Sequence, residues 1–180
     1  MCSTSAAWGL VEPFSPIMFF LSRQAVAIAV ALWLGLGSAV YASTGEDIKQ
    51  LKSLLRSMGT SVVNKKCRDR NLWGFYELDP DRITMCINNG KNVDLDEYWE
   101  TLTHESTHVM QGCKGGNVID DSRIARVYRE LRAINKTSFR DVKGYATSQR
   151  RDEIEARWME LQLASYVLEL LRKTCFDYIK

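Results

Sequence analysis

Residues 95–111 read LDEYWETLTHESTHVMQ, and this stretch decides the fold because it predicts a central helix on which two histidines meet. Asp94 or Asp96 can cap the start of such a helix, and Gly112 can end it. Three apolar residues ahead of the histidines supply the back face that a buried helix needs. They are Tyr98, Trp99 and Leu102.

Within this stretch, residues 104–108 read His-Glu-Ser-Thr-His. Positions i and i+4 of a helix lie one turn apart on the same face, so the imidazoles of His104 and His108 can converge on one metal ion. Zinc is the usual metal of such sites, and with one open position it lowers the pKa of its water to about 7. Glu105 lies beside that position and can accept the proton. The motif predicts Zn²⁺ bound by two histidines, with Glu105 as catalytic base.

Chance is a poor explanation of this motif. The chain has only two histidines, and both stand in it. At average composition, a chain of this length shows the pattern by accident less than about once in a hundred times. The motif therefore outweighs every other functional signal in the sequence.

Length and charge set the broad class. The chain has 180 residues, with 24 Lys and Arg against 22 Asp and Glu, which gives a formal charge of +2. This length suits one domain, and no block of like charge marks a nucleic-acid or membrane surface. The arginines at 123, 126, 129 and 132 are typical of a solvated helix face. Charge therefore indicates no nucleic-acid partner, and the partner we expect, a peptide or protein substrate, follows from the motif.

The N-terminal segment differs from the rest, because residues 24–45 carry no charged side chain and follow a basic flank. This pattern predicts a signal peptide over residues 1–42, cleaved after Ala42, with Met18 as an alternative start. An uncleaved transmembrane anchor is the alternative. The remaining residues, 43–180, are expected to form one secreted or periplasmic domain, or a membrane-anchored one facing outside.

The rest of the chain predicts an α+β domain. Residues 46–58 have the apolar spacing of an amphipathic helix. Residues 72–76 and 82–87 read as the strands of an antiparallel hairpin joined by turn residues. A further helix begins at Asp121 or Ser122, and residues 148–172 predict one long C-terminal helix.

Four cysteines remain after signal cleavage, at positions 67, 86, 113 and 175. An even number in an exported chain predicts two disulfides, for which three pairings exist. Cys67 lies just before the first predicted strand and Cys86 near the end of the second, which favours a bond between them. No CxxC spacing is present, so a cysteine zinc site is not expected.

A third metal ligand must be a carboxylate, since no histidine is left. This excludes the long metzincin pattern, which needs a third histidine. Glu153 and Glu155 at the start of the last predicted helix are the candidates. They lie about 200° apart around a helix, so only one of them can face the metal.

The stretch from Gly74 to Arg157 resembles a minimal member of the gluzincin clan of zinc metallopeptidases. The resemblance rests on the HESTH helix, a cysteine five residues after it, and the Glu-Ile-x-Ala segment at 153–156. Small mitochondrial peptidases have a similar order, and residues 104–111 are similar to the HExxHxxQ motif of small bacterial metallopeptidases. The resemblance implies a zincin-like fold, with a small sheet packed on the active-site helix, and Glu153 as the ligand.

The resemblance also implies a function, an exported peptidase whose sheet edge binds an extended substrate. With Glu153 as ligand, the last helix packs on the motif helix, so Cys113 and Cys175 can meet. The chain departs from the gluzincin pattern at Arg157, where an acid often orients a histidine. Tyr145 is a candidate to stabilise the oxyanion. The alternative functions are a catalytically weak zinc-binding module and a membrane-anchored assembly or processing factor.

Overall fold

The computed structural model describes residues 45–87 and 94–178. The predicted signal peptide or anchor, residues 1–42, lies outside this part of the chain. Among the described helices, none combines the length and apolarity needed to cross a membrane.

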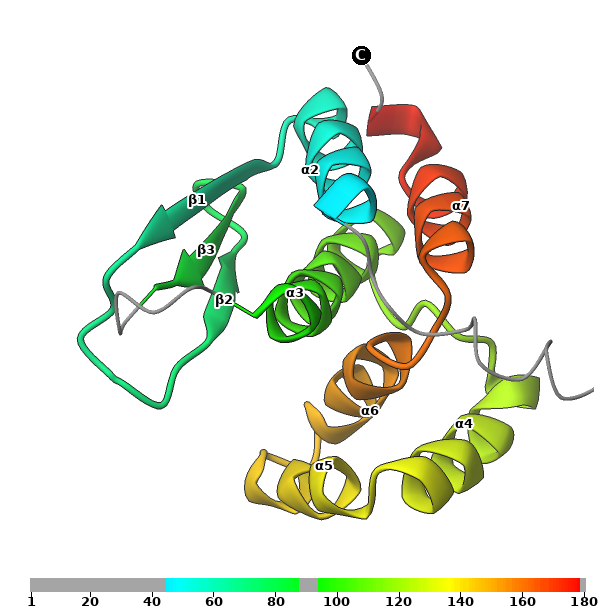
Figure 1. Cartoon of the computed structure of the whole chain (residues 1–180). Coiled ribbons are helices and arrows are strands. Elements are labelled where there is room, and N and C mark those ends of the chain that lie inside the picture. Colours follow the sequence, from blue (N-terminus) through cyan, green and yellow to red (C-terminus); the bar gives the residue numbers. More distant parts are fainter. Residues whose placement is uncertain (1–44, 88–93, 179–180) are drawn as a thin grey trace, which may run out of the picture. The chain divides into compact units, whose positions relative to one another are not determined.

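The described residues form an α+β domain, as predicted, with six α-helices and one small sheet (Figure 1). The helices are α2 (Gly45–Met58), α3 (Leu95–Lys114), α4 (Asp121–Ile134), α5 (Lys136–Asp141), α6 (Arg150–Met159) and α7 (Ala164–Thr174). Two short 3-10 helices are η1 (Val142–Gly144) and η2 (Phe176–Tyr178). The strands are β1 (Ser61–Lys65), β2 (Gly74–Glu77) and β3 (Arg82–Cys86).

The sheet is mixed rather than a simple hairpin. β2 and β3 form the predicted antiparallel pair, and β1 adds a third strand parallel to β3, in the order β1-β3-β2. The sequence analysis missed β1 because its side chains are almost all exposed and give no apolar alternation. The disulfide Cys67–Cys86 joins the segment after β1 to the end of β3, with a Cα–Cα distance of 5.3 Å.

Helix α3 lies at the centre of the domain. Its cap is Asp94, whose side chain accepts a hydrogen bond from the Asp96 N–H at 2.8 Å. The helix does not end at Gly112 as predicted but continues to Lys114, because Gly115 adopts the left-handed conformation (φ 71°) that terminates a helix. Thr103 and Leu102 on its inner face are fully buried.

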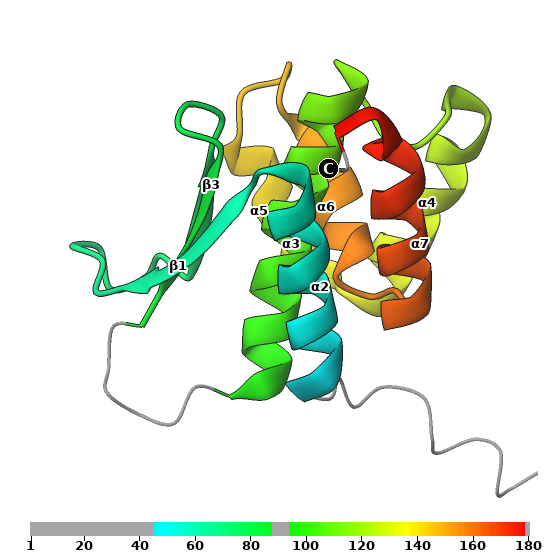
Figure 2. The same cartoon turned by 90° about the horizontal axis from the view of Figure 1, so that it is seen from above.

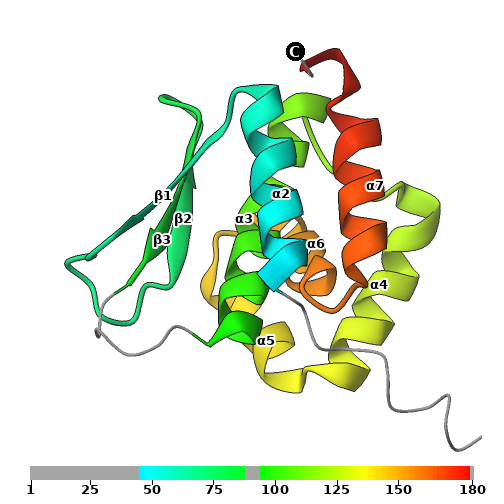
Figure 3. The same cartoon turned by 45° about the horizontal axis from the view of Figure 1, so that its top comes forward.

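The sheet covers one side of α3, and helices cover the others (Figure 1). β2 is the strand in closest contact with α3, while α6 and α7 pack against it from the helical side. α2 lies alongside both α3 and α7 (Figures 2 and 3). The fully buried side chains of this core include Leu51, Leu55, Ile83, Leu102, Met110, Leu131, Met159 and Leu171.

The prediction of one long helix over 148–172 is wrong. The chain turns after α6, and α7 begins at Ala164. A continuous helix of about 25 residues would extend about 37 Å, so both of its halves could not pack against α3 as α6 and α7 do. At the break the carbonyl oxygen of Trp158 accepts hydrogen bonds from the main-chain N–H of Leu161 and from the side chain of Gln162.

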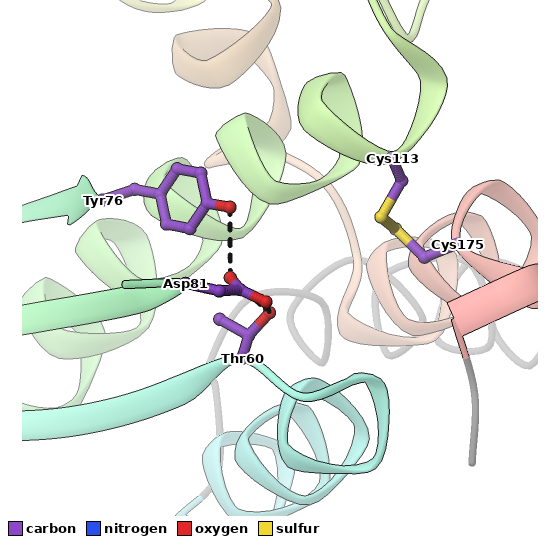
Figure 4. The surroundings of a disulfide bond; sticks show 5 residues. All are labelled: Thr60, Tyr76, Asp81, Cys113 and Cys175. Carbon is purple, nitrogen blue, oxygen red and sulfur yellow. Dashed lines mark hydrogen bonds between the residues drawn. A yellow bond between two sulfur atoms is a disulfide. The ribbon is translucent and has the colours of Figure 1, made fainter. Parts of the chain in front are cut away.

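The turn after α6 also lets the end of α7 reach the end of α3. There the disulfide Cys113–Cys175 joins the two helices, with a Cα–Cα distance of 5.3 Å. The hydroxyl of Tyr76 and that of Thr60 both donate to Asp81 beside it (Figure 4). Both disulfides of the favoured pairing are thus present, and the second fixes α7 to the helix that carries the motif.

Gly74 allows β2 to lie directly against α3. A Cβ atom at this position would stand 2.7 Å from Thr101 Cγ2, 3.1 Å from the Thr84 carbonyl oxygen and 3.5 Å from Glu105 Cγ. We expect Gly74→Ala to lower the free energy of unfolding by about 1–3 kcal/mol, because the added carbon overpacks the junction. Urea unfolding measures this change in the free energy of unfolding. Gly144→Ala, where nothing lies within 4 Å, is the control, and an equal effect of both would contradict this packing account.

Candidate metal centre

Three side chains from two helices bring donor atoms to one point. His104 and His108 come from α3, Glu153 comes from α6, and their ligand atoms all lie within 4.8 Å of one another. The two imidazole Nε2 atoms are 3.3 Å apart. Glu153 Oε2 lies 3.4 Å from His104 Nε2, and Glu153 Oε1 lies 3.7 Å from His108 Nε2. This buried group can hold a metal ion.

The other nitrogen of each imidazole is bonded to an oxygen acceptor. His104 Nδ1 lies 2.7 Å from Oε1 of Glu160, and His108 Nδ1 lies 2.8 Å from Oε1 of Gln111. The Gln111 amide has its nitrogen turned toward the Asp152 carbonyl, so its oxygen faces the imidazole. With both Nδ1 atoms donating, each neutral imidazole keeps its Nε2 lone pair for a metal ion.

The donor set fits a small cation. A tetrahedral zinc ion with bonds of 2.0–2.1 Å has its ligand atoms about 3.4 Å apart, close to the three separations above. Glu153 is 9% exposed, and its Oε2 atom is buried with no hydrogen-bond partner among the described residues. An unpaired buried carboxylate oxygen beside two imidazole lone pairs is what a bound cation would compensate.

Glu155, the alternative ligand, points away from this point. Its carboxylate is fully buried and accepts a hydrogen bond from the Val118 N–H at 2.7 Å, and it lies 3.4 Å from both Gln111 Nε2 and Arg151 Nε. Glu155 therefore ties α6 to the segment before α4 and takes no part in the donor set. Of the two candidates, the structure brings only Glu153 to the histidines.

Glu105 lies between α3 and β2. Its side chain is 7% exposed and contacts the position of Gly74, where the two elements approach most closely. Burial raises the pKa of Glu105, while the imidazoles of His104 and His108 and the main-chain N–H of Tyr76 oppose this shift. A carboxylate with a raised pKa is a stronger base than an ordinary glutamate, which suits it to accept a proton.

A cavity of about 340 Å³ opens next to this group. Its walls come from the segment before β2, from the first half of α3, from Tyr145 and from α6. His104 and Glu105 line it from α3, Arg157 lines it from α6, and Glu160 lines it from the position just after α6. Tyr145 is near both Glu153 and Arg157, since both carboxylate and guanidinium influence its pKa. The structure therefore places Tyr145 at the site, as its candidate role requires.

The pKa values of His104 and Glu153 depend on each other. Burial lowers the pKa of His104, but the carboxylates of Glu153 and Glu160 outweigh it and raise the pKa to about 9. Burial raises the pKa of Glu153, but His104, His108 and Arg157 reverse this and hold it below its usual value. Without a metal, a proton on His104 therefore balances the Glu153 carboxylate.

This coupling predicts a pH dependence of the metal-free protein. The pKa of His104 rises from 6.5 to about 9 on folding, so the folded state binds the extra proton between these values. The resulting stabilisation of the folded state is complete below about pH 6.5 and is lost as the pH rises through about 9. Urea unfolding after chelation at a series of pH values measures it, with His104→Gln as the control that lacks this loss. A stability that increases over the same interval would contradict the assignment.

Sequence analysis missed Glu160, and it assigned no role to Gln111 although this residue closes the HExxHxxQ pattern. Arg157 stands where an orienting acid was expected, and the orienting carboxylate is instead Glu160, whose side chain is 6% exposed. Arg157 NH1 lies 3.1 Å from the same Oε1 atom and holds it in place. Helical spacing is the signal that could have found both residues. Glu160 lies two helical turns after Glu153, and Gln111 lies three residues after His108, so each lies on the same helix face as a ligand.

Glu160→Gln tests this orienting role. The substitution keeps the shape but removes the charge that fixes His104, so we expect zinc affinity to fall by about tenfold. Competition with a chromophoric chelator measures the affinity. Glu169→Gln on the exposed face of α7 is the control, and an unchanged affinity in Glu160→Gln would contradict the role.

Comparison with known proteins gives one match. The model of a family described as a domain of unknown function, DUF8637, matches residues 44–176. No curated protein and no solved structure matches the chain. The matched range contains all three members of the donor set, Glu105 and both disulfides. The chain belongs to the DUF8637 family.

Proposed function

We propose that this protein is an exported zinc metallopeptidase. The observation that carries the proposal is the convergence of His104, His108 and Glu153 beside the buried carboxylate of Glu105. Nitrogen and carboxylate donors of this kind are those that zinc prefers, and three protein ligands leave a position open for chemistry. Two disulfides agree with an oxidising compartment outside the cytosol.

The residues divide the reaction between them. Zinc, when bound, supplies a water of lowered pKa and polarises the substrate carbonyl. Glu105 accepts the proton of the attacking water and passes it to the leaving amine nitrogen. Tyr145 and Arg157 line the same cavity and offer an O–H and a guanidinium to the developing negative charge. Each step then has a group on this chain to perform it.

The substrate is proposed to bind along β2. Within the described sheet β2 is an edge strand, and Gly74 brings its start against the helix that carries Glu105. An extended peptide can add to such an edge through main-chain hydrogen bonds. This would place a scissile bond close to the donor set without requiring a particular sequence.

Removal and return of the metal test the proposal. We expect the oxidised protein to bind one zinc ion and to cleave a fluorescently labelled unfolded protein. This activity should be lost after treatment with a chelator and should return when one equivalent of zinc is added. Protein that binds one zinc ion and cleaves no substrate would overturn the peptidase proposal and favour the zinc-binding module. Activity unaffected by the chelator would overturn the role of the metal.

A further inference from the structure

The cavity beside the donor set has the position of a substrate subsite. It lies between the segment before β2, the first half of α3 and α6, and His104 and Glu105 form part of its wall. A group bound in the cavity would therefore contact the proposed reacting centre.

The wall of the cavity carries an excess of negative charge. Four carboxylates line it, from Glu97, Glu100, Glu105 and Glu160, against the one guanidinium of Arg157. Arg157 is engaged by Glu160 at 3.1 Å. Within residues 45–87 and 94–178, neither Glu97 nor Glu100 makes an ion pair. Two of the four carboxylates in the cavity lining can therefore attract a further cation.

These two carboxylates lie on the same face of α3 as the motif. Glu97, Glu100 and His104 are spaced at i, i+3 and i+7, which places them in one row along the helix. Burial raises the pKa of Glu100, and the charges of Glu160, Asp96 and Glu97 raise it further. A cation in the cavity would relieve this repulsion.

Another part of the lining is apolar and aromatic. Trp73 is 57% exposed and Leu72 is 38% exposed, and both line the cavity. The alkyl stem of a lysine or arginine packs well against such residues, and its charged end is attracted by an aromatic face. A lining that combines apolar side chains with carboxylates therefore matches a long basic side chain better than an apolar or acidic one.

We propose that this cavity is a subsite for a lysine or arginine side chain next to the scissile bond, and that Glu100 is its main specificity-determining residue. The inference rests on the proposed peptidase function for the scissile bond. The binding preference itself rests on the cavity, its carboxylates and Trp73.

Mapping of cleavage sites tests the subsite in the active protein. We expect the wild type to cut an unfolded protein mixture preferentially beside basic residues, as seen by mass spectrometry, and Glu100→Gln to reduce that preference at least about fivefold. Glu169→Gln, an exposed carboxylate on α7 outside the cavity, should leave it unchanged. Cleavage without a basic preference, or a preference that survives Glu100→Gln, would overturn the subsite.

Binding without turnover separates the subsite from the peptidase proposal. In the zinc-loaded Glu105→Gln protein, calorimetry with an octapeptide that contains one arginine, and with its citrulline twin, compares a charged and a neutral side chain of equal shape. We expect the arginine peptide to bind about tenfold more tightly, and Glu100→Gln to bring the two dissociation constants within about twofold. Equal constants before that substitution would overturn the subsite. An arginine preference in Glu105→Gln, together with a wild-type protein that binds zinc and cleaves nothing, would support the subsite and overturn the peptidase.

Discussion

Replacing Glu105 by Gln is expected to remove peptide hydrolysis while leaving the zinc content unchanged. Glutamine has the shape of glutamate but cannot accept the proton of the attacking water. General bases contribute about 10²–10⁴-fold to the rate, so kcat/KM should fall by at least about a hundredfold. Glu105 belongs to no part of the donor set, and one equivalent of zinc should remain bound.

The matched control for Glu105→Gln is Glu169→Gln, which changes the same charge on an exposed face of α7. Zinc is measured by atomic emission and cleavage by the release of labelled peptides. Glu105→Gln protein with normal zinc and more than about a tenth of the wild-type activity would exclude Glu105 as the base.

The second large effect separates Glu153 from Glu155. Glu153→Ala removes a donor whose Oε2 atom has no hydrogen-bond partner, so we expect zinc affinity to fall by more than about a hundredfold. Metal-free stability should change little above about pH 9, where His104 no longer carries the extra proton that Glu153 stabilises. Glu155→Ala leaves the buried Val118 N–H without its acceptor and should cost about 1–3 kcal/mol of unfolding free energy. Its folded fraction should still bind zinc.

Both variants are compared by zinc titration and by urea unfolding in the presence of a chelator. Glu153→Ala should bind zinc more weakly than Glu155→Ala does. Glu155→Ala should have the lower free energy of unfolding. If Glu155→Ala alone lost zinc while folded, the assignment of the third ligand would be wrong.

The parts of the fold that could be predicted are those with a local signal. The i, i+4 spacing of His104 and His108 predicted where the imidazoles meet, and the hairpin followed from its turn and from the aromatic and β-branched residues beside it. The pairing of Cys67 with Cys86 required only the order of the strands. Each of these features depends on residues that are close in the sequence or joined by one short connection.

The parts that were missed depend on tertiary packing. β1 has exposed side chains and exists because β3 offers it a parallel partner, which no periodicity in residues 61–65 reveals. Residues 160–163 contain no proline or glycine, and the helix breaks there because α6 and α7 both pack on α3. Helix propensity could not predict this turn, since tertiary contacts outweigh it.

The break after α6 is related to the carboxylate that orients His104. Arg157 stands at the position where an orienting acid was expected. The structure supplies Glu160 instead, at the first position after α6, where it reaches His104 and is held by Arg157. The turn that sequence analysis missed is therefore next to the residue that orients the first ligand.

The most direct test of the central claim is anomalous diffraction at the zinc absorption edge, from crystals of the oxidised protein supplied with one equivalent of zinc. We expect one strong peak within about 2.0–2.2 Å of His104 Nε2, His108 Nε2 and a Glu153 carboxylate oxygen. Full zinc occupancy at another place, or no zinc between these three side chains, would contradict the account.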